Sequence, residues 1–139
     1  MKTQLSYVNP EGACPAQGLY SHATYVPAGP LYFIAGQLSV GADGGVVGRN
    51  DFGAQFQQVF KNMGDVLAGL GLGFPDVIKF TTYLVHSQDL ALFMRLREQL
   101  FPKLFEGPLF PPNTLLVVDR LVKEDFVFEV EAVVKARGA

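Results

Sequence analysis

Two glutamates near the end of the chain are the residues whose types and spacing most favour chemistry. Glu129 and Glu131 lie two apart within the apolar and β-branched run 126–134. Residues two apart on a strand point to the same face, where two carboxylates among apolar neighbours are unfavourable without partners or a function. A partly buried carboxyl group has a raised pKa and exchanges protons near neutral pH. The pair therefore predicts either a proton-transfer site or a structural acid pair.

A loop near the N-terminus offers further polar groups. Tyr20 is followed by Ser21 and His22, and its phenol can hydrogen-bond a ligand carboxylate or water. The alternative for Tyr20 is packing at a subunit edge. His22 suits acid–base work, or a structural hydrogen bond in a turn. A nucleophilic pair of Cys14 and His22 lacks a third group to orient it.

The overall composition is that of one small apolar domain. The chain has 139 residues, of which 49% are hydrophobic and 17% are charged. A small domain cannot bury so much apolar surface within itself. We therefore expect a single domain, 1–139, that forms a homo-oligomer.

Charge and cysteine content exclude several classes of protein. The formal net charge is −2 and the basic residues are scattered, so a nucleic-acid surface is not favoured. One cysteine permits no disulfide within the chain, and no zinc-ligand spacing is present. No apolar run is long enough to span a membrane, and no apolar segment follows the N-terminal charge. We expect a cytoplasmic protein with no metal, no cofactor and no membrane partner.

The elements that must position these residues follow from periodicity and turn residues. Asp51 is a suitable N-cap for a helix that ends at Gly69, Gly71 and Gly73, and Ser87 for a second helix that ends near Pro102. Strands are predicted over 5–8, 23–26, 31–37, 76–85, 114–118 and 126–134, with the last two forming a pair. The order βββ-α-β-α-ββ predicts an α+β two-layer domain, with both helices on one sheet face and subunit contacts on the other.

Several motifs, spread over nearly the whole length, resemble one family. The segments are Gly18-Leu19-Tyr20-Ser21-His22-Ala23, 31–37 ending in Ala35-Gly36-Gln37, 55–70, 76–84, Asp119-Arg120-Leu121 and Glu129-Val130-Glu131-Ala132. In order and spacing they are similar to the RidA/YjgF family of small trimeric proteins. The resemblance implies a chorismate-mutase-like fold and hydrolysis of enamines or imines to a keto acid and ammonia, in a cleft between adjacent subunits.

The resemblance also assigns residues to that cleft. It places the ligand-positioning tyrosine on Tyr20, the backbone glycine on Gly36 and the glutamate that works with water on Glu129. Glu131 would be scaffold or a trimer contact. The arginine that holds the substrate carboxylate falls on Asn113, which carries no charge and otherwise shapes a turn after two prolines.

Replacing that arginine by Asn113 should weaken carboxylate binding roughly tenfold or more, because a charge-assisted hydrogen bond is the stronger kind. Arg120 is a poor substitute: it lies seven residues further on, about 23 Å along an extended strand. Met94, Leu115, Phe33 and Phe110 would make the cleft more apolar. For Met94 and Phe33 we favour core packing over ligand contact.

Three functions remain open. The first is a homotrimeric imine or enamine deaminase that uses water and Glu129. The second is a protein that binds a small acid, imine or amide without turnover. The third, an endoribonuclease, is disfavoured by the acidic charge balance and the absence of a basic stripe. A chorismate mutase would need several positive groups around a dianion, and we reject it.

Overall fold

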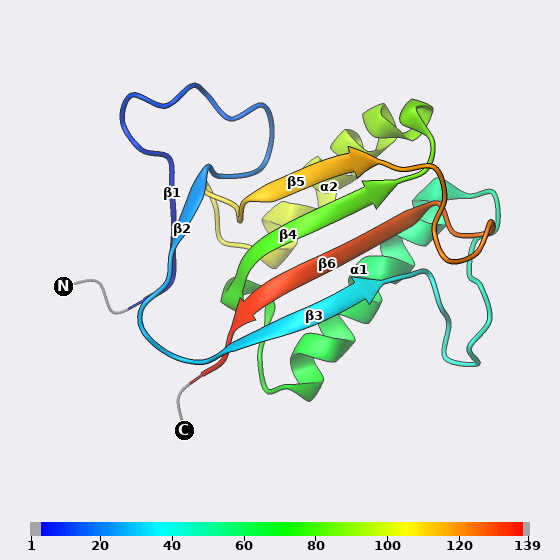
Figure 1. The fold of residues 1–139 in the computed structure, drawn as a ribbon, viewed down its shortest axis with the longest axis horizontal. Coiled ribbons are helices and arrows are strands. Elements are labelled where there is room, and N and C mark those ends of the chain that lie inside the picture. The colour runs from blue at the N-terminus through cyan, green and yellow to red at the C-terminus, as the bar shows by residue number, and fades with distance from the viewer. Residues whose placement is uncertain (1–3, 138–139) are drawn as a thin grey trace.

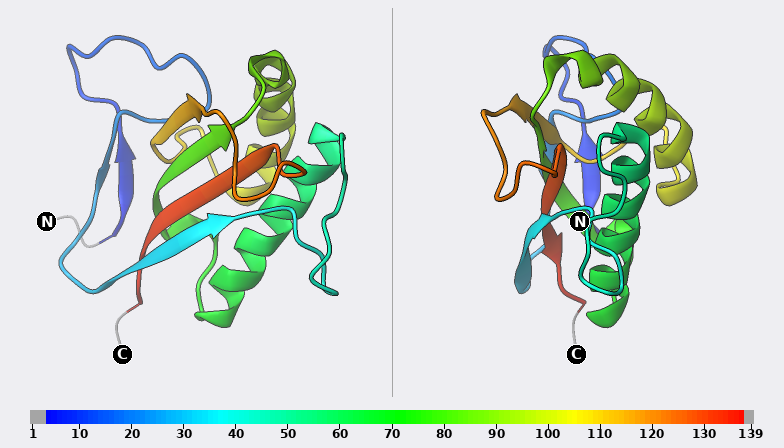
Figure 2. Two further views of the ribbon diagram at one scale, coloured as in Figure 1. Left: turned by 45° about the vertical axis from the view of Figure 1, so that its right-hand side comes forward. Right: turned by 90° about the vertical axis from the view of Figure 1, so that its right-hand side faces the viewer.

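The protein is a two-layer α+β domain in the computed structural model, which describes residues 4–137. Two helices, α1 (Phe52–Gly69) and α2 (Leu90–Leu104), cover one face of a four-stranded sheet (Figures 1 and 2). The sheet contains β3 (Leu31–Gln37), β4 (Val77–Leu84), β5 (Asn113–Val117) and β6 (Phe128–Lys135). Two short 3-10 turns, Phe74–Asp76 and Ser87–Asp89, precede β4 and α2. This arrangement confirms the predicted fold class.

The sheet is mixed, in the order β3-β6-β4-β5. Strand β6 pairs antiparallel with β3 and β4, whereas β5 pairs parallel with β4. The prediction that the last two strands pair with each other is therefore wrong. The connection after β5 crosses over β4, so the polar turn does not close a hairpin. As a result β5 is an edge strand, and the two glutamates of β6 lie near the middle of the sheet.

Helix α1 forms where the sequence predicts it. Asp51 is its N-cap and accepts a hydrogen bond from the Ala54 amide at 3.0 Å. The buried side of the helix packs against β6, and the aromatic rings of Phe56 and Phe128 stack with centroids 5.4 Å apart. This apolar contact between α1 and the centre of β6 fixes the helix layer against the strand that carries the glutamates.

Helix α2 ends near Pro102 as predicted but begins differently. Ser87 belongs to the 3-10 turn, and α2 begins at Leu90 without a side-chain cap, so the predicted cap is wrong. The helix continues through Pro102 to Leu104. Its buried residues recur every four positions, at Phe93, Arg97 and Phe101, so that a charged residue occupies the apolar side of the helix.

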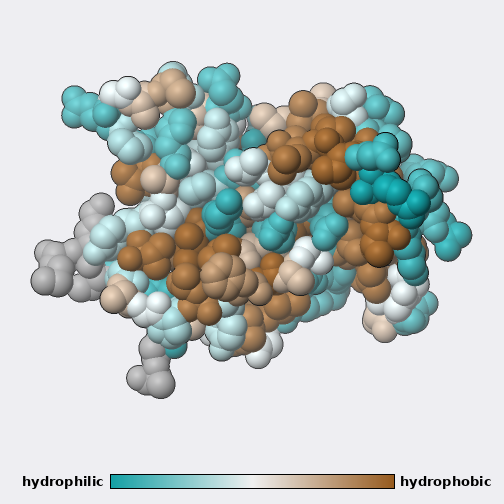
Figure 3. Space-filling model, viewed as in Figure 1, coloured by the Kyte–Doolittle hydropathy of each residue, from teal (hydrophilic) through white to brown (hydrophobic). Residues whose placement is uncertain are grey.

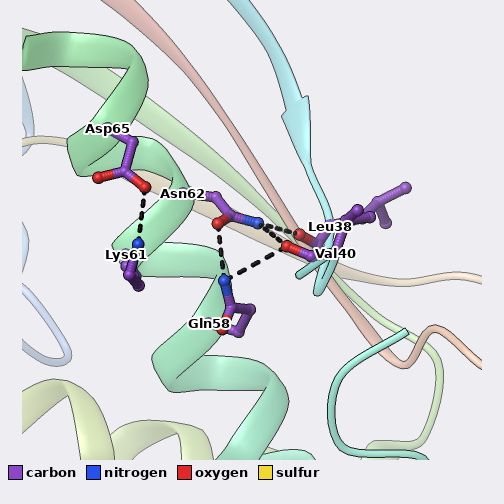
Figure 4. A network of polar contacts seen from close by, with 6 residues as sticks. All are labelled: Leu38, Val40, Gln58, Lys61, Asn62 and Asp65. Atoms are coloured by element: carbon purple, nitrogen blue, oxygen red, sulfur yellow. Dashed lines mark hydrogen bonds and ion pairs between the residues drawn. The ribbon is translucent and has the colours of Figure 1, made fainter. Parts of the chain in front are cut away.

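Two polar side chains, Gln55 and Asn62, attach α1 to the segments around the glutamates. The buried Gln55 donates to the carbonyls of Gly48 and Asp125 at 3.0 and 2.8 Å, and accepts from the Val127 amide at 2.9 Å. Asn62 donates to the carbonyls of Leu38 and Val40, both at 2.9 Å (Figure 4). The entry to β6 and the exit from β3 are thereby held in fixed positions beside the same helix.

A two-stranded arm stands apart from the main sheet (Figure 1). Its strands are β1 (Ser6–Val8) and β2 (Ala23–Tyr25), which pair antiparallel. Two side-chain hydroxyls fasten the arm to β4: Tyr7 donates to the Val77 carbonyl and Thr24 to the Ile78 carbonyl, each at 2.7 Å. The loop between β1 and β2 carries Tyr20.

The sheet face opposite the helices is uncovered and partly apolar. Figure 3 shows this face, with hydrophobic surface over β3 and near the end of β5 and hydrophilic surface between them. The side chain of Phe33 is 77% exposed, and those of Leu31 and Leu116 are each more than one-third exposed. Within residues 4–137, no helix is long and apolar enough to cross a membrane.

Candidate functional site

Glu129 lies on the uncovered face of the sheet, directly over Gly36. A Cβ atom added to Gly36 would lie 2.6 Å from Cδ and 2.9 Å from Cγ of Glu129, closer than such atoms approach in proteins. Glycine at position 36 therefore makes the room that the carboxylate occupies. The sequence resemblance had assigned both residues to the site, and the structure places them in contact.

The second glutamate has a structural partner. Across the β4–β6 ladder, Tyr83 lies opposite Glu129 and Thr81 lies opposite Glu131. The phenol of Tyr83 donates a short hydrogen bond to Oε1 of Glu131. Glu131 is thus fastened to β4, as expected of a scaffold residue, whereas no hydrogen bond to the Glu129 carboxylate is found within residues 4–137.

The surroundings of Glu129 on this face raise its pKa. Burial raises the pKa of the Glu129 carboxyl group above its ordinary value, and the negative charge of Glu131 raises it further. The hydrogen bond to Glu131 also raises the pKa of the Tyr83 phenol. A carboxyl group with a raised pKa is a better proton acceptor when ionised than an ordinary glutamate.

Four further candidates meet on the other side of the sheet, beneath α2. A cavity of about 230 Å³, called the Arg97 cavity below, lies between α2, the start of β5 and the arm loop. Four of the residues that the resemblance assigns to the cleft line it: Tyr20, Met94, Asn113 and Leu115. Its other lining residues are Gln17, Leu90 and Arg97.

Tyr20 and Asn113 also line a second hollow of about 440 Å³. In the arm loop, the Tyr20 oxygen accepts a hydrogen bond from the Gln17 amide at 3.1 Å, so its own proton remains available to a ligand. Asn113 accepts a hydrogen bond from the buried hydroxyl of Thr82 at 2.6 Å through its amide oxygen. No hydrogen bond from the Asn113 amide nitrogen, a donor, is found within residues 4–137.

The two groups of residues are too far apart to hold one small ligand within a single chain. Asn113 pairs with Phe80, whereas Glu129 pairs with Tyr83, three residues further along β4. Three residues along a strand amount to about 10 Å, and the two strand spacings from β5 to β6 amount to about 10 Å across the sheet. The two groups also lie on opposite faces of the sheet. A site that uses both needs a neighbouring copy of the chain.

Arg97 lines this candidate cavity and is absent from the residues that the sequence predicts for the site. It is 3% exposed and lines the same cavity as Asn113. A signal was present, because position 97 lies four residues from both Phe93 and Phe101 on the apolar side of α2. Charged residues are rarely found at such buried positions unless they are paired.

Other expected residues occupy different surroundings. Phe33 is not packed in the core, as we had favoured, but is 77% exposed on the uncovered face. Met94 packs partly against the core and also lines the Arg97 cavity. Phe110 is buried in the core.

The structure also gives the surroundings of His22, Cys14 and Arg120, which were alternatives for the chemistry of the site. The His22 ring nitrogen Nε2 contacts the backbone oxygen of Cys14 at 2.6 Å, so this hydrogen bond involves the backbone and leaves the thiol out. Arg120 pairs with Glu124 at 3.0 Å and donates to the Leu121 carbonyl at 3.1 Å, which is the structural role expected for it. In residues 4–137 no three histidine, cysteine or acidic side chains come together in a way that could hold a metal ion.

Comparisons with known proteins agree with this architecture. Residues 11–136 match the family model described as Endoribonuclease L-PSP. A RutC family protein of Pyrococcus horikoshii is 33% identical over 123 residues, covering 88% of this chain and 91% of the relative. A 2-iminobutanoate/2-iminopropanoate deaminase of Salmonella typhimurium is 29% identical over 127 residues, covering 91% and 94%.

Among solved structures, a Rid family protein of unknown function from Yersinia pestis superposes with a TM-score of 0.83. It is 30% identical, and the alignment covers 95% of this chain and 98% of that one. The match extends over the arm, the sheet and both helices, because it covers nearly all of both chains.

Proposed function

Because this chain belongs to the RidA/YjgF family, we propose that it is a hydrolytic deaminase of small imines or enamines. The observation that carries the proposal is the placement of Glu129: a carboxylate with a raised pKa, seated over Gly36 and held on a central strand. The similar deaminase of Salmonella typhimurium supports the choice of substrate class.

The active unit in this proposal is a homotrimer. The uncovered sheet face, with its exposed Phe33, packs against neighbouring copies. One chain supplies Glu129 and Gly36 to the cleft, and its neighbour supplies Tyr20, Asn113 and the Arg97 cavity. The distance between the two groups within one chain supports this division, since neither group alone combines a base with a ligand cavity.

The reaction needs only water and a proton carrier. Ionised Glu129 accepts a proton from water as the oxygen adds to the imine carbon, and passes this proton to the imine nitrogen, which becomes an amine. Glu129 then accepts the hydroxyl proton of this intermediate as the carbonyl forms and passes it to the nitrogen, so that the carbon–nitrogen bond breaks and ammonia leaves. An enamine first becomes an imine when its carbon is protonated.

The test is to generate 2-aminoacrylate in place and to follow the release of ammonia and keto acid. We expect release above the rate in buffer, and its loss in Glu129→Gln while the secondary structure is retained. Release no faster than in buffer contradicts the deaminase proposal. If such a protein still bound a small acid or amide, the second function, ligand binding without turnover, would replace it.

A further inference from the structure

Arg97 is a buried cation that forms no ion pair with an acidic side chain of residues 4–137. Its side chain is 3% exposed. Its Nε atom is buried without a hydrogen-bond partner in this part of the chain. One bond is made, from Nη2 to the sulfur of Met94 at 3.2 Å, and a thioether is a weak acceptor.

The surroundings of Arg97 within residues 4–137 hold the guanidinium in place but provide no direct ion pair. Its carbon Cζ lies 4.9 Å from the centre of the Phe93 ring, a cation–π contact. Burial lowers the pKa of Arg97 from its ordinary value, and the opposing electrostatic effects of Tyr20 and Glu98 are smaller. A buried arginine remains charged, and such a charge is strongly unfavourable unless something pairs with it.

In the arm loop, Gly18 leaves space for the guanidinium of Arg97. A Cβ atom at Gly18 would lie 2.6 Å from Nη2 of Arg97 and 3.1 Å from Cε of Met94. A side chain at residue 18 would therefore displace the guanidinium from the position that it occupies beneath the loop. The guanidinium borders the Arg97 cavity, where Tyr20 and Asn113 supply further polar groups beside an apolar wall of Leu90 and Leu115.

We propose that Arg97 binds the carboxylate of a small aliphatic monocarboxylate in this cavity. The nature of that ligand rests on the proposed function, since the imine of a small amino acid carries such a group. Asn113 is neutral, and Arg97 supplies from helix α2 the positive charge that position 113 lacks. A cavity of about 230 Å³ suits an acid of a few carbon atoms.

The experiment compares propanoate with propanamide, two ligands of nearly the same shape that differ in charge. Neither is an imine, so binding is measured without turnover. We expect the wild-type protein to bind propanoate roughly tenfold more tightly than propanamide, the difference between a charged and a neutral hydrogen bond. Titration calorimetry or chemical-shift titration gives both affinities.

The variant Arg97→Met should lose that preference and should also have an equal or higher midpoint of thermal unfolding without ligand, because an unpaired buried charge has been removed. Arg95→Met, on an exposed position of the same helix, should keep the preference. Gly18→Ala keeps the charge but displaces the guanidinium, so its preference for propanoate should also fall.

Three results overturn the assignment. They are equal affinities of the wild-type protein for the two ligands, unchanged affinity in Arg97→Met with a lower unfolding midpoint, and dissociation of the oligomer by Arg97→Met. The last would mean that an acid of a neighbouring copy pairs with Arg97. Glu129→Gln separates this inference from the deaminase proposal: it should stop imine turnover but keep the preference for propanoate.

Discussion

The carboxylate of Glu129 occupies the space that a side chain at residue 36 would fill. Gly36 lies on β3 and Glu129 on β6, so the contact joins two neighbouring strands. It predicts that Gly36→Ala forces Glu129 into another rotamer. We expect a fall in kcat of about 100-fold, the order of effect of a 1 Å misplacement, with a loss in unfolding free energy of about 1 kcal/mol or less.

Steady-state ammonia release and urea unfolding measure these two quantities. Gly69→Ala is a suitable control, because a Cβ atom there would meet nothing within 4 Å. An active Gly36→Ala protein would show that the position of Glu129 does not matter for the reaction.

Glu131 should influence how kcat/KM depends on pH. Its negative charge helps to raise the pKa of Glu129. As a base, Glu129 must be ionised, so kcat/KM should rise with pH through that pKa, above the ordinary glutamate value of about 4.3. In Glu131→Gln the charge is gone, so the acid limb of the pH profile should move to lower pH. A limb that stays in place would contradict the coupling.

Gln55 should contribute strongly to stability. Its side chain satisfies the amide of Val127 and the carbonyls of Gly48 and Asp125. Gln55→Leu leaves these groups without partners and should lower the unfolding free energy by about 2–4 kcal/mol. Urea unfolding measures the loss. Gln57→Leu, at an exposed position of the same helix, should change it little.

The exposed Phe33 should be essential for assembly. Burying a phenylalanine side chain stabilises an interface by about 1.5–3 kcal/mol per copy, and a buried unpaired charge opposes it. Phe33→Glu should therefore shift the mass in light scattering from that of a trimer to that of a single chain. Ala68→Glu, exposed on α1, should leave the trimer intact. A Phe33→Glu protein that remains trimeric would place the interface elsewhere.

An arginine at position 113 should replace the function of the arginine at position 97, because both positions border one cavity. The double variant Arg97→Met/Asn113→Arg should recover roughly tenfold in propanoate affinity over Arg97→Met alone. Arg97→Met/Asn113→Gln, which adds no charge, should recover nothing. If neither double variant binds propanoate better, the carboxylate does not occupy this cavity. Titration with propanoate measures all three proteins.

Much of the fold was predictable because its signals are local. The cap at Asp51 is set by residues within a single turn, and the periodicity of α1 by the next eighteen residues. Strand order is not local: β5 joins β4 through a parallel pairing and not β6 through the turn that follows it. No pattern in the sequence of these strands distinguishes the two partners.

The candidate site was predictable where it rests on motifs, and incomplete where it rests on packing. Gly36 and Glu129 were assigned from their motifs and are in contact. Arg97 belongs to no such motif, and its burial depends on the arm loop closing over it at Gly18. Exposure of Phe33 was likewise missed, because an apolar strand residue does not reveal which of the two sheet faces it occupies.

The arm has a consequence for the rate at which ligands enter and leave. It carries one wall of the Arg97 cavity, yet it is bonded to the main sheet by the hydroxyls of Tyr7 and Thr24 and not by a strand ladder. A segment held this way opens with less free energy than the sheet needs to unfold. We therefore expect a ligand in this cavity to enter and leave as β1 and β2 lift, while the sheet and both helices stay folded.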